Sequence, residues 1–415
     1  MTLSEELAWR GFINQTTYKD TAVIDQAAPK FYMGFDASAD SQTVGNLAAM
    51  MFVKTFLRHG AEGVLLAGGS TSLIGDPGGK DAERPLQDES VIAQNVAKAG
   101  EQLKAVLRGH DFELVNNLDW TRGLTVIPFL RDIGKHFSMT PLVQRDYIAK
   151  RIGEGGAGIS YTEFSYTILQ GLDYLHLFDN KGVTLQLGGS DQWGNCLSGV
   201  ELIRRARGQE VNVMTLNLII NKATGKKFGK TESGAVWLDP AKTSPTQFYQ
   251  FWINSDDEGV EEYLKVFTEL DKGAVDAVMA EHRANPAARI AQTRLAQEVT
   301  SLVHGEPAEV IAAQVTDVLT GKKTIDAVDD PTLLALRDEI PSATTSESGS
   351  VVDALVSTNL ASSNTEARRL IDGNAISING VKVDREQFEP ADFQNGRLLL
   401  KRGKAFKDSA LIERA

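Results

Sequence analysis

Three glycine-rich segments carry the side chains of this sequence that are best suited to chemistry. They span residues 32–47, 75–84 and 186–195, and each follows an apolar run that predicts a β-strand. Their carboxylates, amides and hydroxyls alternate with glycines, whose bare backbone leaves room for a flat base or a ribose. If the runs before them are parallel strands, the three segments meet at one edge of a sheet and form a binding crevice.

The first segment combines two glycines with residues that suit the start of a helix. Gly34 and Gly45 remove side chains where an adenine or a ribose could lie against the backbone. Thr43 and Asn46 are typical of a helix N-terminus, whose free N–H groups attract phosphate. Taken alone, this segment is explained more simply as ordinary capping of a core helix.

The other two segments favour a nucleotide or substrate site. Asp76 follows a predicted strand and is itself followed by the cations Lys80 and Arg84. The third segment offers Asp191 and Gln192 beside glycine backbone. A protein core has no need of such groups at one rim of a sheet, so we interpret the three segments together as a binding site.

A polar stripe runs along the predicted helix over residues 161–174. Tyr166, Gln170 and Asp173 stand at positions i, i+4 and i+7 and therefore share one face of that helix. A phenol, an amide and a carboxylate on one stripe could bind an α-amino group and a hydroxyl. A partly exposed polar face is the simpler alternative.

A basic segment at residues 225–231 is similar to a phosphate-binding P-loop but is one residue short of that pattern. Its Lys227, Lys230 and Thr231 suit a loop that brings ammonium groups to a phosphate chain. A solvated basic turn explains the same residues about equally well. A second motif, G-x-G-x-x-G at residues 153–158, follows a charged helical stretch instead of a strand, so we interpret it as a glycine loop between helices.

The elements that must position these groups alternate between strands and helices in the first half of the chain. Apolar runs predict strands over residues 31–35, 64–67, 124–127 and 183–187, and residues 45–57 have helical spacing. Strand, helix and strand in this order predict right-handed parallel units. We therefore expect an α/β fold with a Rossmann-like, doubly wound parallel sheet and ligands at the carboxyl ends of its strands.

The second half of the chain predicts a helical domain, a linker and a small α+β domain. Helix formers at helical spacing cover residues 261–270, 274–284, 287–303 and 307–319. Residues 341–350 form a polar run without an apolar period, which predicts a linker. The expected domains are a catalytic domain with a connective insertion at 1–220, a loop and link at 221–244, a helical domain at 245–340, the linker at 341–350 and the α+β domain at 351–415.

The composition is that of a folded globular protein, with 42% hydrophobic and 24% charged residues. A length of 415 residues exceeds one ordinary core, so two or three domains are expected. The single cysteine, Cys196, excludes an internal disulfide and suits a reducing cytosol. The sequence begins without a secretory signal pattern, and the apolar stretch at 47–53 is too short to cross a bilayer, so we expect a cytoplasmic location and no membrane partner.

The net charge of −12 argues against a general polyanion binder. The charge is uneven, because residues 351–415 hold ten Lys and Arg against nine Asp and Glu. A basic cluster within this stretch consists of Arg397, Lys401, Arg402, Lys404 and Lys407. The composition therefore permits a specific, salt-sensitive RNA contact at the C-terminal domain.

Together and in order, these motifs resemble those of bacterial-type tyrosyl-tRNA synthetases, which are class I aminoacyl-tRNA synthetases. The resemblance covers nearly the whole chain and is carried by residues 9–11, 14–17, 32–36, 73–77, 129–137, 164–166, 188–195, 227–231 and 248–254. It implies that L-tyrosine attacks the α-phosphate of ATP to give tyrosyl-adenylate and pyrophosphate. The tyrosyl group then moves to the 3′ end of tRNA(Tyr).

The resemblance also implies a tyrosine site. Tyr32 and Asp173 would pair with the phenol of the substrate. The contacts implied for its amino-acid end are Asp76, Tyr166 and Gln170 for the α-ammonium, and Gln192 for the carboxylate. A site that hydrogen-bonds the phenol leaves polar groups unpaired when phenylalanine binds, which gives a physical basis for selecting tyrosine. The standard example of such selection is itself a tyrosyl-tRNA synthetase, so we expect only the direction of the effect and no particular magnitude.

An ATP site and a catalytic set are implied in the same way. The residues implied to lie along the nucleotide are Gly34, Asp36, Ser38, Gly45, Gly188, Asp191 and Lys230. Lys80 and Arg84 would reach the leaving pyrophosphate, and Lys227, Lys230 and Thr231 occupy the family's KMSKS-type loop. Adenylate formation needs in-line positioning and cations on the pyrophosphate, not a covalent catalyst. ATP would bring Mg²⁺ as part of the substrate, and we expect neither a tightly bound cofactor nor a metal site of the protein itself.

One departure from the family pattern concerns the signature His-x-Gly-His, which reads Thr43-Val44-Gly45-Asn46 here. The Asn46 amide and the Thr43 hydroxyl are the donors that could replace the two imidazoles. One hypothesis is an active synthetase that uses these donors, and the other is a catalytically impaired, synthetase-like RNA-binding or regulatory protein. We favour the active enzyme because the tyrosine pocket and the loop lysines are all present.

A third hypothesis, a ligase that passes tyrosyl-adenylate to an acceptor other than tRNA, is disfavoured by the C-terminal domain. Residues 364–380 resemble an S4-type RNA-binding domain, with a capped helix followed by a strand and a turn. The RNA-binding residues expected there are Arg368, Arg369, Lys401, Arg402 and Lys404. A small structural domain with a surface arginine pair remains the alternative. The resemblance also implies a homodimer, with residues 129–137 near its interface.

Overall fold

The computed structural model describes residues 1–78, 86–144, 146–225, 227–231, 234–403 and 408–415. These residues form two compact units. The first unit comprises residues 1–243 and 255–295, and the second unit comprises residues 244–254 and 296–415. None of the helices in the described ranges combines the length and the apolarity that crossing a bilayer requires.

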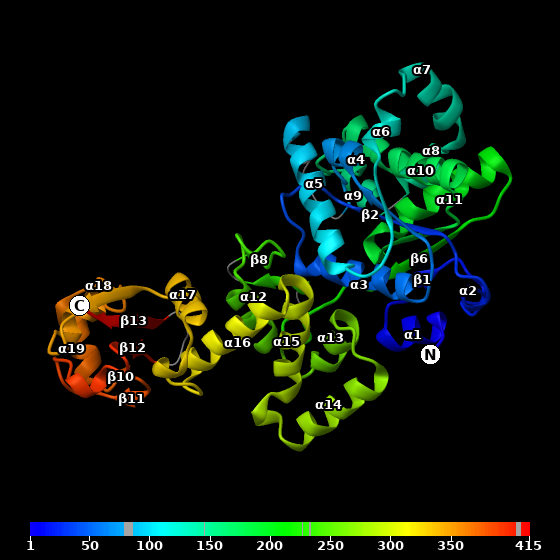
Figure 1. Cartoon of the computed structure of the whole chain (residues 1–415). Coiled ribbons are helices and arrows are strands. Elements are labelled where there is room, and N and C mark those ends of the chain that lie inside the picture. The colour runs from blue at the N-terminus through cyan, green and yellow to red at the C-terminus, as the bar shows by residue number, and fades with distance from the viewer. Residues whose placement is uncertain (79–85, 145, 226, 232–233, 404–407) are drawn as a thin grey trace. The chain divides into compact units, whose positions relative to one another are not determined.

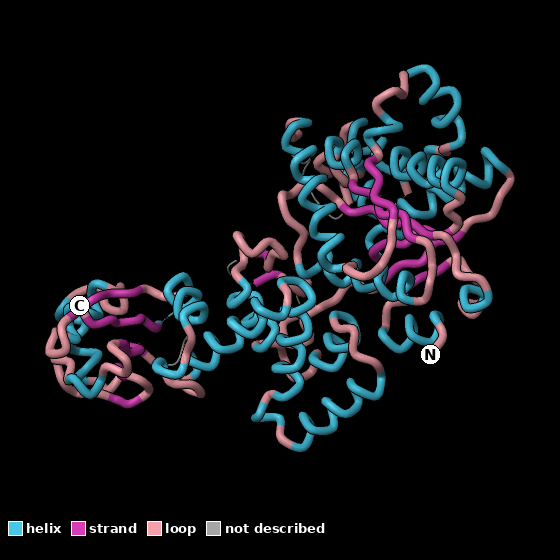
Figure 2. The backbone as a smooth tube through the Cα atoms, viewed as in Figure 1, coloured by secondary structure: helices cyan, strands magenta, loops and turns pink. Residues whose placement is uncertain are grey.

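The first unit is built on a six-stranded sheet, drawn in magenta in Figure 2. Its strand order is β1-β6-β5-β2-β3-β4, and only β1 runs antiparallel to its neighbour. The strands are β1 (Gln15–Thr16), β2 (Phe31–Phe35), β3 (Gly63–Ala67), β4 (Glu113–Asn116), β5 (Leu185–Gly189) and β6 (Asn212–Leu216). This parallel-dominated sheet confirms the predicted α/β class, and three of the four predicted strands fall on β2, β3 and β5.

The rest of the first unit is mainly helical. Its α-helices are α1 (Leu3–Arg10), α2 (Val23–Gln26), α3 (Val44–Arg58), α4 (Gly69–Ile74), α5 (Glu89–Val106), α6 (Leu118–Thr121), α7 (Val126–Pro128), α8 (Met139–Val143), α9 (Asp146–Ile152), α10 (Tyr161–Lys181), α11 (Trp193–Arg207), α13 (Val260–Phe267) and α14 (Lys272–Ala284). Shorter helical turns are η1 (Phe129–Ile133), η2 (Gly134–His136), η3 (Ser190–Gln192) and η4 (Pro286–Ala288), and a hairpin is formed by β7 (Lys230–Thr231) and β8 (Gly234–Ala235). Helix α15 (Ile290–His304) includes residues of both units.

Helices cover both faces of the sheet. Successive side chains of β2 point to opposite faces, and each contacts a different helix. The ring centroid of Phe31 lies 5.2 Å from that of Phe56 in α3, on one face. The ring centroid of Tyr32 lies 5.2 Å from that of Tyr174 in α10, on the other face. Figure 1 shows α11 alongside α10 on this second side. Strands that are buried on both faces read as nearly continuous apolar runs, which is why their sequences predicted them well.

The predicted strand at residues 124–127 is wrong. This stretch enters the short helix α7, and the parallel strand that follows β3 in the chain is β4 at Glu113–Asn116. Val126 and Ile127 are 69% and 66% exposed, so their β-branched and apolar character does not serve a buried strand. Strand β4 lies at the sheet edge and is only partly buried, so its mixed sequence lacks the apolar run that marks the central strands.

Helix α10, which carries the predicted polar stripe, has clear start and stop signals. The Ser160 Oγ atom accepts a hydrogen bond from Glu163 N at 3.2 Å, and the helix is followed by Gly182 at φ 71°. The Glu163 carboxylate accepts two hydrogen bonds from the Arg151 guanidinium, at 2.6 and 2.8 Å. The glycine motif at 153–158 joins α9 to α10 and follows no strand, which confirms that it is a loop between helices.

The second unit pairs helices with a five-stranded sheet of order β11-β10-β12-β13-β9. Its strands are β9 (Ser342–Thr345), β10 (Ile376–Ile378), β11 (Val381–Lys382), β12 (Arg397–Arg402) and β13 (Ser409–Arg414). Its helices are α12 (Pro245–Ile253), α16 (Glu306–Thr320), η5 (Ile325–Ala327), α17 (Asp330–Glu339), α18 (Val351–Ser357), α19 (Asn364–Asp372) and η6 (Pro390–Asp392). The four helices predicted over 261–319 are confirmed as α13, α14, α15 and α16, with ends that shift by one to three residues.

The sheet of the second unit separates two apolar clusters. Leu398 and Leu400 belong to a cluster with residues of α18 and α19. Leu399 and Leu411 belong to a second cluster with residues of α16 and α17, such as Leu336. Because side chains alternate along β12, the same strand contributes to both clusters.

The linker predicted at 341–350 is wrong in part, because residues 342–345 form strand β9. This strand pairs in parallel with β13, with Ser342 opposite Leu411 and Thr345 opposite Arg414. Its Ser-Ala-Thr-Thr sequence has no apolar period, and a strand at a sheet edge needs none because its backbone makes the pairing. The other predicted domain boundaries stay predictions.

Candidate active site

A fully buried carboxylate stands on helix α10. Asp173 in α10 is 2% exposed and accepts hydrogen bonds from Asn117 Nδ2 at 3.0 Å and from Trp120 Nε1 at 2.9 Å. Burial raises the pKa of Asp173 to about 7, although both hydrogen bonds act to lower it. The Trp120 indole is itself held, since it stacks on His176 with ring centroids 4.4 Å apart. The carboxylate is thus held in place and poised to change charge near neutral pH.

Next to this carboxylate is a buried hydroxyl that none of the described residues satisfies. Tyr32 in β2 is 2% exposed, and its hydroxyl has no hydrogen-bond partner among them. Burial raises the pKa of Tyr32 well above its ordinary value, and the nearby Cys196 and Asp173 add to that effect. A buried hydroxyl without a partner costs free energy, so this one indicates a place for a polar ligand group.

Gln186 is a neighbour of Tyr32 that the sequence reasoning did not assign. The two residues stand opposite each other in the β2–β5 register, and the Gln186 Oε1 atom is also buried without a partner among the described residues. The sequence did contain a signal for it, because a glutamine within an otherwise apolar, buried strand indicates a polar group that needs a partner. Asn117 and Trp120 were missed as well, because they follow β4, which the sequence did not predict.

A chain of hydrogen bonds brings together the predicted residues of the second and third segments. Gln192 Nε2 donates to Asp76 Oδ2 at 2.6 Å, and Gly78 N donates to Asp76 Oδ1 at 2.8 Å. The Gln192 Oε1 atom accepts from Asn195 Nδ2 at 3.2 Å. Asp76 and Gln192, from the second and third segments, therefore belong to one polar wall of hydrogen-bonded side chains.

The stripe on α10 faces the same region. Gln170 Nε2 lies 3.9 Å from the Cys196 Sγ atom, and Tyr166 is close enough to Tyr32 to raise its pKa further. Burial raises the pKa of the Cys196 thiol, with smaller contributions from Asp191 and Asp76. The predicted residues Tyr166, Gln170 and Asp173 thus lie on a face of α10 that is turned toward Tyr32 and Cys196.

The turn after β2 is organised around one carboxylate. Asp36 Oδ1 accepts from Ser38 N at 2.8 Å and from Ser72 Oγ at 2.9 Å, and Asp36 Oδ2 accepts from Ser38 Oγ at 2.9 Å. At Gly34, an added Cβ would meet only the Leu66 side chain, at 4.0 Å. At Gly188, an added Cβ would come within 3.1 Å of Cys196 Sγ. Gly34 therefore leaves open space, whereas Gly188 is required by close packing.

Thr43 and Asn46 bind each other at the start of α3. The Asn46 Oδ1 atom accepts from Thr43 N at 3.0 Å and from Thr43 Oγ1 at 2.8 Å. The Thr43 hydroxyl is therefore engaged here, which differs from its expected role as a direct donor to a ligand. No described residue accepts from the Asn46 Nδ2 group, so Asn46 supplies the unused donors of this segment.

The basic loop lies beside this same helix start. Val44 N donates to Val236 O at 3.0 Å, and Leu238 N donates to Gln42 O at 2.9 Å. Gly229 has φ +84°, and an added Cβ would come within 3.2 Å of Val44 Cβ. The loop thus reaches α3 with its backbone, and the β7–β8 hairpin that begins at Lys230 follows directly. Lys227 is exposed next to this contact.

Several predicted residues cannot be placed or are placed differently. Lys80, Arg84 and Lys404 lie outside the described residues. Lys401 Nζ donates to Leu319 O at 2.7 Å, and burial lowers the pKa of this lysine. Arg402 donates to Leu360 O at 2.9 Å and to Asp408 at 2.7 Å. These two side chains hold the second unit together in the free protein, contrary to a freely presented basic cluster.

Arg368 and Arg369 are the predicted RNA-binding residues that stand exposed. Both lie on α19, and Arg368 makes a 3.2 Å ion pair with Glu386 in which both side chains are more than half exposed. Such an exposed pair is weak and is easily exchanged for another anion. These two arginines are therefore the described candidates for a phosphate contact in the second unit.

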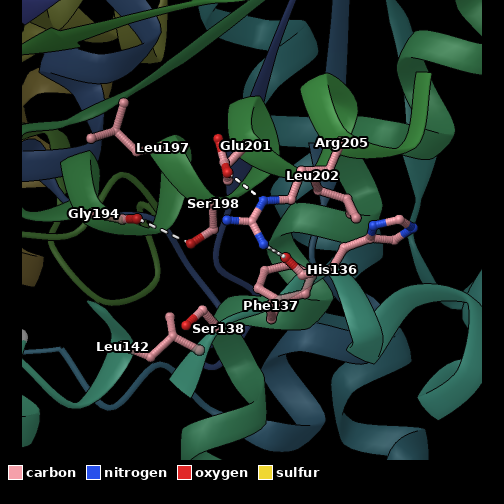
Figure 3. Close-up of a pocket in the computed structure, with 10 residues that line it drawn as sticks. All are labelled: His136, Phe137, Ser138, Leu142, Gly194, Leu197, Ser198, Glu201, Leu202 and Arg205. Atoms are coloured by element: carbon pink, nitrogen blue, oxygen red, sulfur yellow. Dashed lines mark hydrogen bonds and ion pairs between the residues drawn. The ribbon is translucent and has the colours of Figure 1, made fainter. Parts of the chain in front are cut away.

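A pocket of about 290 Å³ lies between η2 and α11 (Figure 3). Its lining includes Phe137, Leu142 and Leu197, and Arg205 donates to His136 O at 3.0 Å. It contains none of the predicted site residues. Residues 126–139 nearby expose apolar side chains among charged ones, with Leu130 48% exposed and Met139 58% exposed.

Comparisons with known proteins cover both units. A family model described as class I tRNA synthetases (W and Y) matches residues 25–319. A second, described as the tyrosine–tRNA ligase SYY-like C-terminal domain, matches residues 333–407. The chain is 41% identical to a tyrosine–tRNA ligase of Bacteroides fragilis, over 97% of this chain and 98% of the relative. It is 42% identical to one of Streptomyces avermitilis, over 99% of this chain and 98% of the relative.

Solved structures agree with these relatives. A C-terminally truncated mitochondrial tyrosyl-tRNA synthetase of Aspergillus nidulans superposes with a TM-score of 0.67 at 30% identity, covering 75% of this chain and 92% of that one. A tyrosyl-tRNA synthetase of Archaeoglobus fulgidus, crystallised with L-tyrosine, gives a TM-score of 0.55 at 13% identity, covering 74% of this chain and 99% of that one. At 13% identity, the likeness to the Archaeoglobus fulgidus structure shows a shared fold.

Proposed function

The chain belongs to the class I tyrosyl-tRNA synthetases, the tyrosine–tRNA ligases, and from that premise we propose how its own residues carry the reaction. The substrates of this ligation are tyrosine, ATP and tRNA. The hypothesis of a catalytically impaired relative is not supported, because the full-length relatives are ligases. The observation that carries the proposal is the unpartnered Tyr32 hydroxyl within electrostatic reach of the buried Asp173 carboxylate.

We propose that the tyrosine phenol completes this pair. Its hydroxyl would donate to the Asp173 carboxylate and accept from Tyr32, which would satisfy the buried hydroxyl. Phenylalanine would leave the Tyr32 hydroxyl unpaired and would offer no donor to the Asp173 carboxylate. Asp76, Tyr166 and Gln170 would hold the α-ammonium, and Gln192, which is bound to Asp76, would orient the carboxylate. This assignment is supported by the polar wall and the α10 face described above.

The ATP would lie along the turn after β2. Asp36 and Ser38 would contact the nucleotide with Asp191, and Gly34, Gly45 and Gly188 would give its flat parts access to backbone. Asn46 would donate to the phosphates, oriented by the Thr43 hydroxyl that binds its Oδ1 atom. Lys80, Arg84, Lys227, Lys230 and Thr231 are proposed to neutralise the pyrophosphate as charge builds on it.

We infer that Mg²⁺ arrives with ATP as part of the substrate. Among the described residues, no group of three or more His, Cys, Asp or Glu side chains could hold a metal ion. The carboxylates nearest the nucleotide path are already used: Asp36 binds Ser38 and Ser72, and Asp76 binds Gln192. We also propose a cytoplasmic location, where tRNA and ATP are available.

A homodimer is proposed through the exposed apolar side chains of residues 126–139. Val126 and Ile127 are more than 60% exposed there, and the pocket between η2 and α11 adjoins this stretch. Exposed apolar groups that cluster in one region mark interaction surfaces. A second copy of the chain is the occupant that the family resemblance implies.

The decisive experiment is ATP–pyrophosphate exchange, followed by charging of tRNA(Tyr). Exchange should require tyrosine and should not be supported by phenylalanine at the same concentration. Exchange with no transfer to tRNA would point to a different acceptor. Exchange at the level of a no-tyrosine control would contradict the proposed activity.

Tyrosine binding should weaken as the pH falls below 7. The pKa of Asp173 in the free protein is about 7, and the proposed pairing uses the ionised form, which is the stronger acceptor for the phenol proton. At pH 6 about one molecule in ten would be ionised, so the KM for tyrosine should rise about tenfold over its value at pH 8. Exchange assays across pH 5.5–8.5 measure this, with the KM for ATP as the internal reference. A KM for tyrosine that does not change over this range would refute the role of the carboxylate.

Reversing the charges of Arg368 and Arg369 should impair charging of tRNA. Each lost phosphate contact weakens RNA binding and reduces its salt dependence, so Arg368→Glu with Arg369→Glu should lower charging by about tenfold at moderate salt. Exchange should be unchanged, because these residues lie outside the crevice. Lys272→Glu, a reversal at another exposed cation, is the control. Equal charging by both variants would leave the arginine pair without an RNA role.

A further inference from the structure

The loop that carries Lys227 and Lys230 has an aromatic anchor on helix α13. The Phe228 ring centroid lies 4.3 Å from that of Tyr263 and 5.5 Å from that of Phe267. Phe228 is 7% exposed and Tyr263 is fully buried. Phe228 directly follows Lys227 and stands two residues before Lys230. The contact therefore fixes the backbone between the two lysines.

The Tyr263 hydroxyl also touches the stretch of chain from which the loop departs. It donates to Asp256 Oδ2 at 2.9 Å and accepts from Lys222 N at 3.4 Å. Its oxygen lies 3.4 Å from Ile220 O, and residue 220 forms an isolated β-bridge with Lys227. The Tyr263 side chain thus makes two kinds of contact. Its ring packs on Phe228 within the loop, and its hydroxyl contacts residues 220–222 just before the loop.

The space for the Tyr263 ring depends on a glycine. An added Cβ at Gly259 would lie 2.3 Å from both the Cζ and the hydroxyl oxygen of Tyr263. Gly259 has an ordinary φ of −95°, so its conformation does not demand glycine. Gly259 N also donates to Asp256 Oδ1 at 2.6 Å, which fixes the carboxylate that receives the Tyr263 hydroxyl. Gly259 and Asp256 therefore hold the phenol of Tyr263 in one position.

The far side of the same loop is tied to the start of α3. Gly229 lies against Val44, and Val236 N donates to Gly229 O at 3.0 Å. The loop backbone is therefore held between α13 on one side and α3 on the other. Phe228 is adjacent to Lys227 and only two residues before Lys230, where the hairpin begins. A shift of the Phe228 ring would therefore move both lysines.

We propose that Tyr263 is a positioning residue for adenylate formation, which holds the loop so that Lys227 and Lys230 meet the phosphates of ATP. This inference rests on the proposed role of the loop. Tyr263 touches neither substrate, and it acts through Phe228 and the backbone at residues 220–222. Its loss should leave the tyrosine pocket intact, because no contact joins it to Tyr32 or Asp173 among the described interactions.

The test compares two substitutions at this position by exchange kinetics. Tyr263→Phe keeps the ring contact and removes the hydroxyl, and it should lower kcat for exchange about threefold. Tyr263→Leu removes both contacts and should lower kcat about tenfold. The KM for tyrosine should stay within about twofold of the parent value in both variants, while the KM for ATP rises.

A structural control separates positioning from lost stability. Phe12→Leu removes a buried ring that contacts Phe52 and does not touch the loop. It should lower Tm as Tyr263→Leu does, but without a fall in kcat. A second check combines Tyr263→Leu with Phe228→Leu, whose effects on kcat should be less than additive because the two rings share one contact.

The outcomes distinguish this inference from the function on which it rests. If Lys230→Ala lowers exchange while Tyr263→Phe keeps the full rate and Tyr263→Leu matches Phe12→Leu, the positioning role is wrong and the role of the loop stands. If Lys230→Ala also has the full rate, the proposed role of the loop itself is wrong. Parallel changes in the KM for tyrosine and for ATP would likewise overturn the positioning role. Should Tyr263→Leu fail to fold, Tyr263→Phe alone decides by its kcat.

Discussion

Replacing Asp173 with asparagine should lower kcat/KM for tyrosine by about a hundredfold or more. The carboxylate accepts from Asn117 and Trp120 and is proposed to accept from the phenol as well. An asparagine amide offers one acceptor and would turn an N–H group toward one of these donors. Losing a hydrogen bond to a charged group costs about 1.5–3 kcal/mol, and leaving a buried donor unsatisfied costs about 1–3 kcal/mol more. Exchange kinetics at pH 8, where the parent carboxylate is ionised, measure this loss.

The same substitution should flatten the pH dependence of stability of the ligand-free protein. The pKa of Asp173 is raised by folding from 3.8 to about 7, so its stabilising contribution is complete below pH 4 and is lost as the pH rises through 7. Thermal unfolding of Asp173→Asn should lack this decline between pH 4 and 7. Asp179→Asn, on the exposed end of the same helix, is the matched control. A variant with normal exchange but altered unfolding would assign Asp173 a structural role only.

Replacing Lys230 with alanine should lower the rate of adenylate formation by about 10²–10³. Removing one well-placed donor to a developing charge typically costs this much, because the charge has no other partner at that position. Lys230 begins the hairpin that follows the contact of Gly229 with the start of α3, and Asn46, the proposed donor to the phosphates, stands at the same helix start. Tyrosine binding should be unchanged, since the phenol pocket lies elsewhere.

Rapid mixing of the enzyme with tyrosine and ATP measures this rate apart from product release. Lys222→Ala, at an exposed lysine that pairs with Glu262 near the start of the same loop, is the control. It removes the same charge without touching the hairpin. If both variants lose the rate equally, the effect is one of general charge and not of the position of Lys230.

The predictable part of this molecule is the part with a strong local signal. Strands β2, β3 and β5 are buried on both faces and therefore appear as apolar runs, and the stripe on α10 follows from helical spacing alone. Asn117 and Trp120 gave no such signal. They reach Asp173 from a separate segment after an edge strand, and only the folded chain brings that segment to the carboxylate.

The C-terminal basic cluster shows a second limit of sequence reasoning. A count of charges treats Lys401, Arg402 and Arg369 alike. In the fold, Lys401 and Arg402 bind backbone carbonyls of Leu319 and Leu360, and Arg369 stays exposed. Composition alone cannot tell a cation that binds backbone carbonyls within the fold from one that is exposed and able to bind a phosphate.

Strand β13 has a consequence for the order in which the second unit can form. It lies between β12 and β9 in the sheet, yet it is the last of the five strands in the sequence. While a ribosome makes this chain, β9 emerges long before β13, with which it pairs, and Leu336 emerges before Leu411 can cover it. Bringing ends so far apart in sequence together is a slow step. This unit should therefore complete its fold only after its last strand has been synthesised, whereas the parallel sheet of the first unit can close earlier.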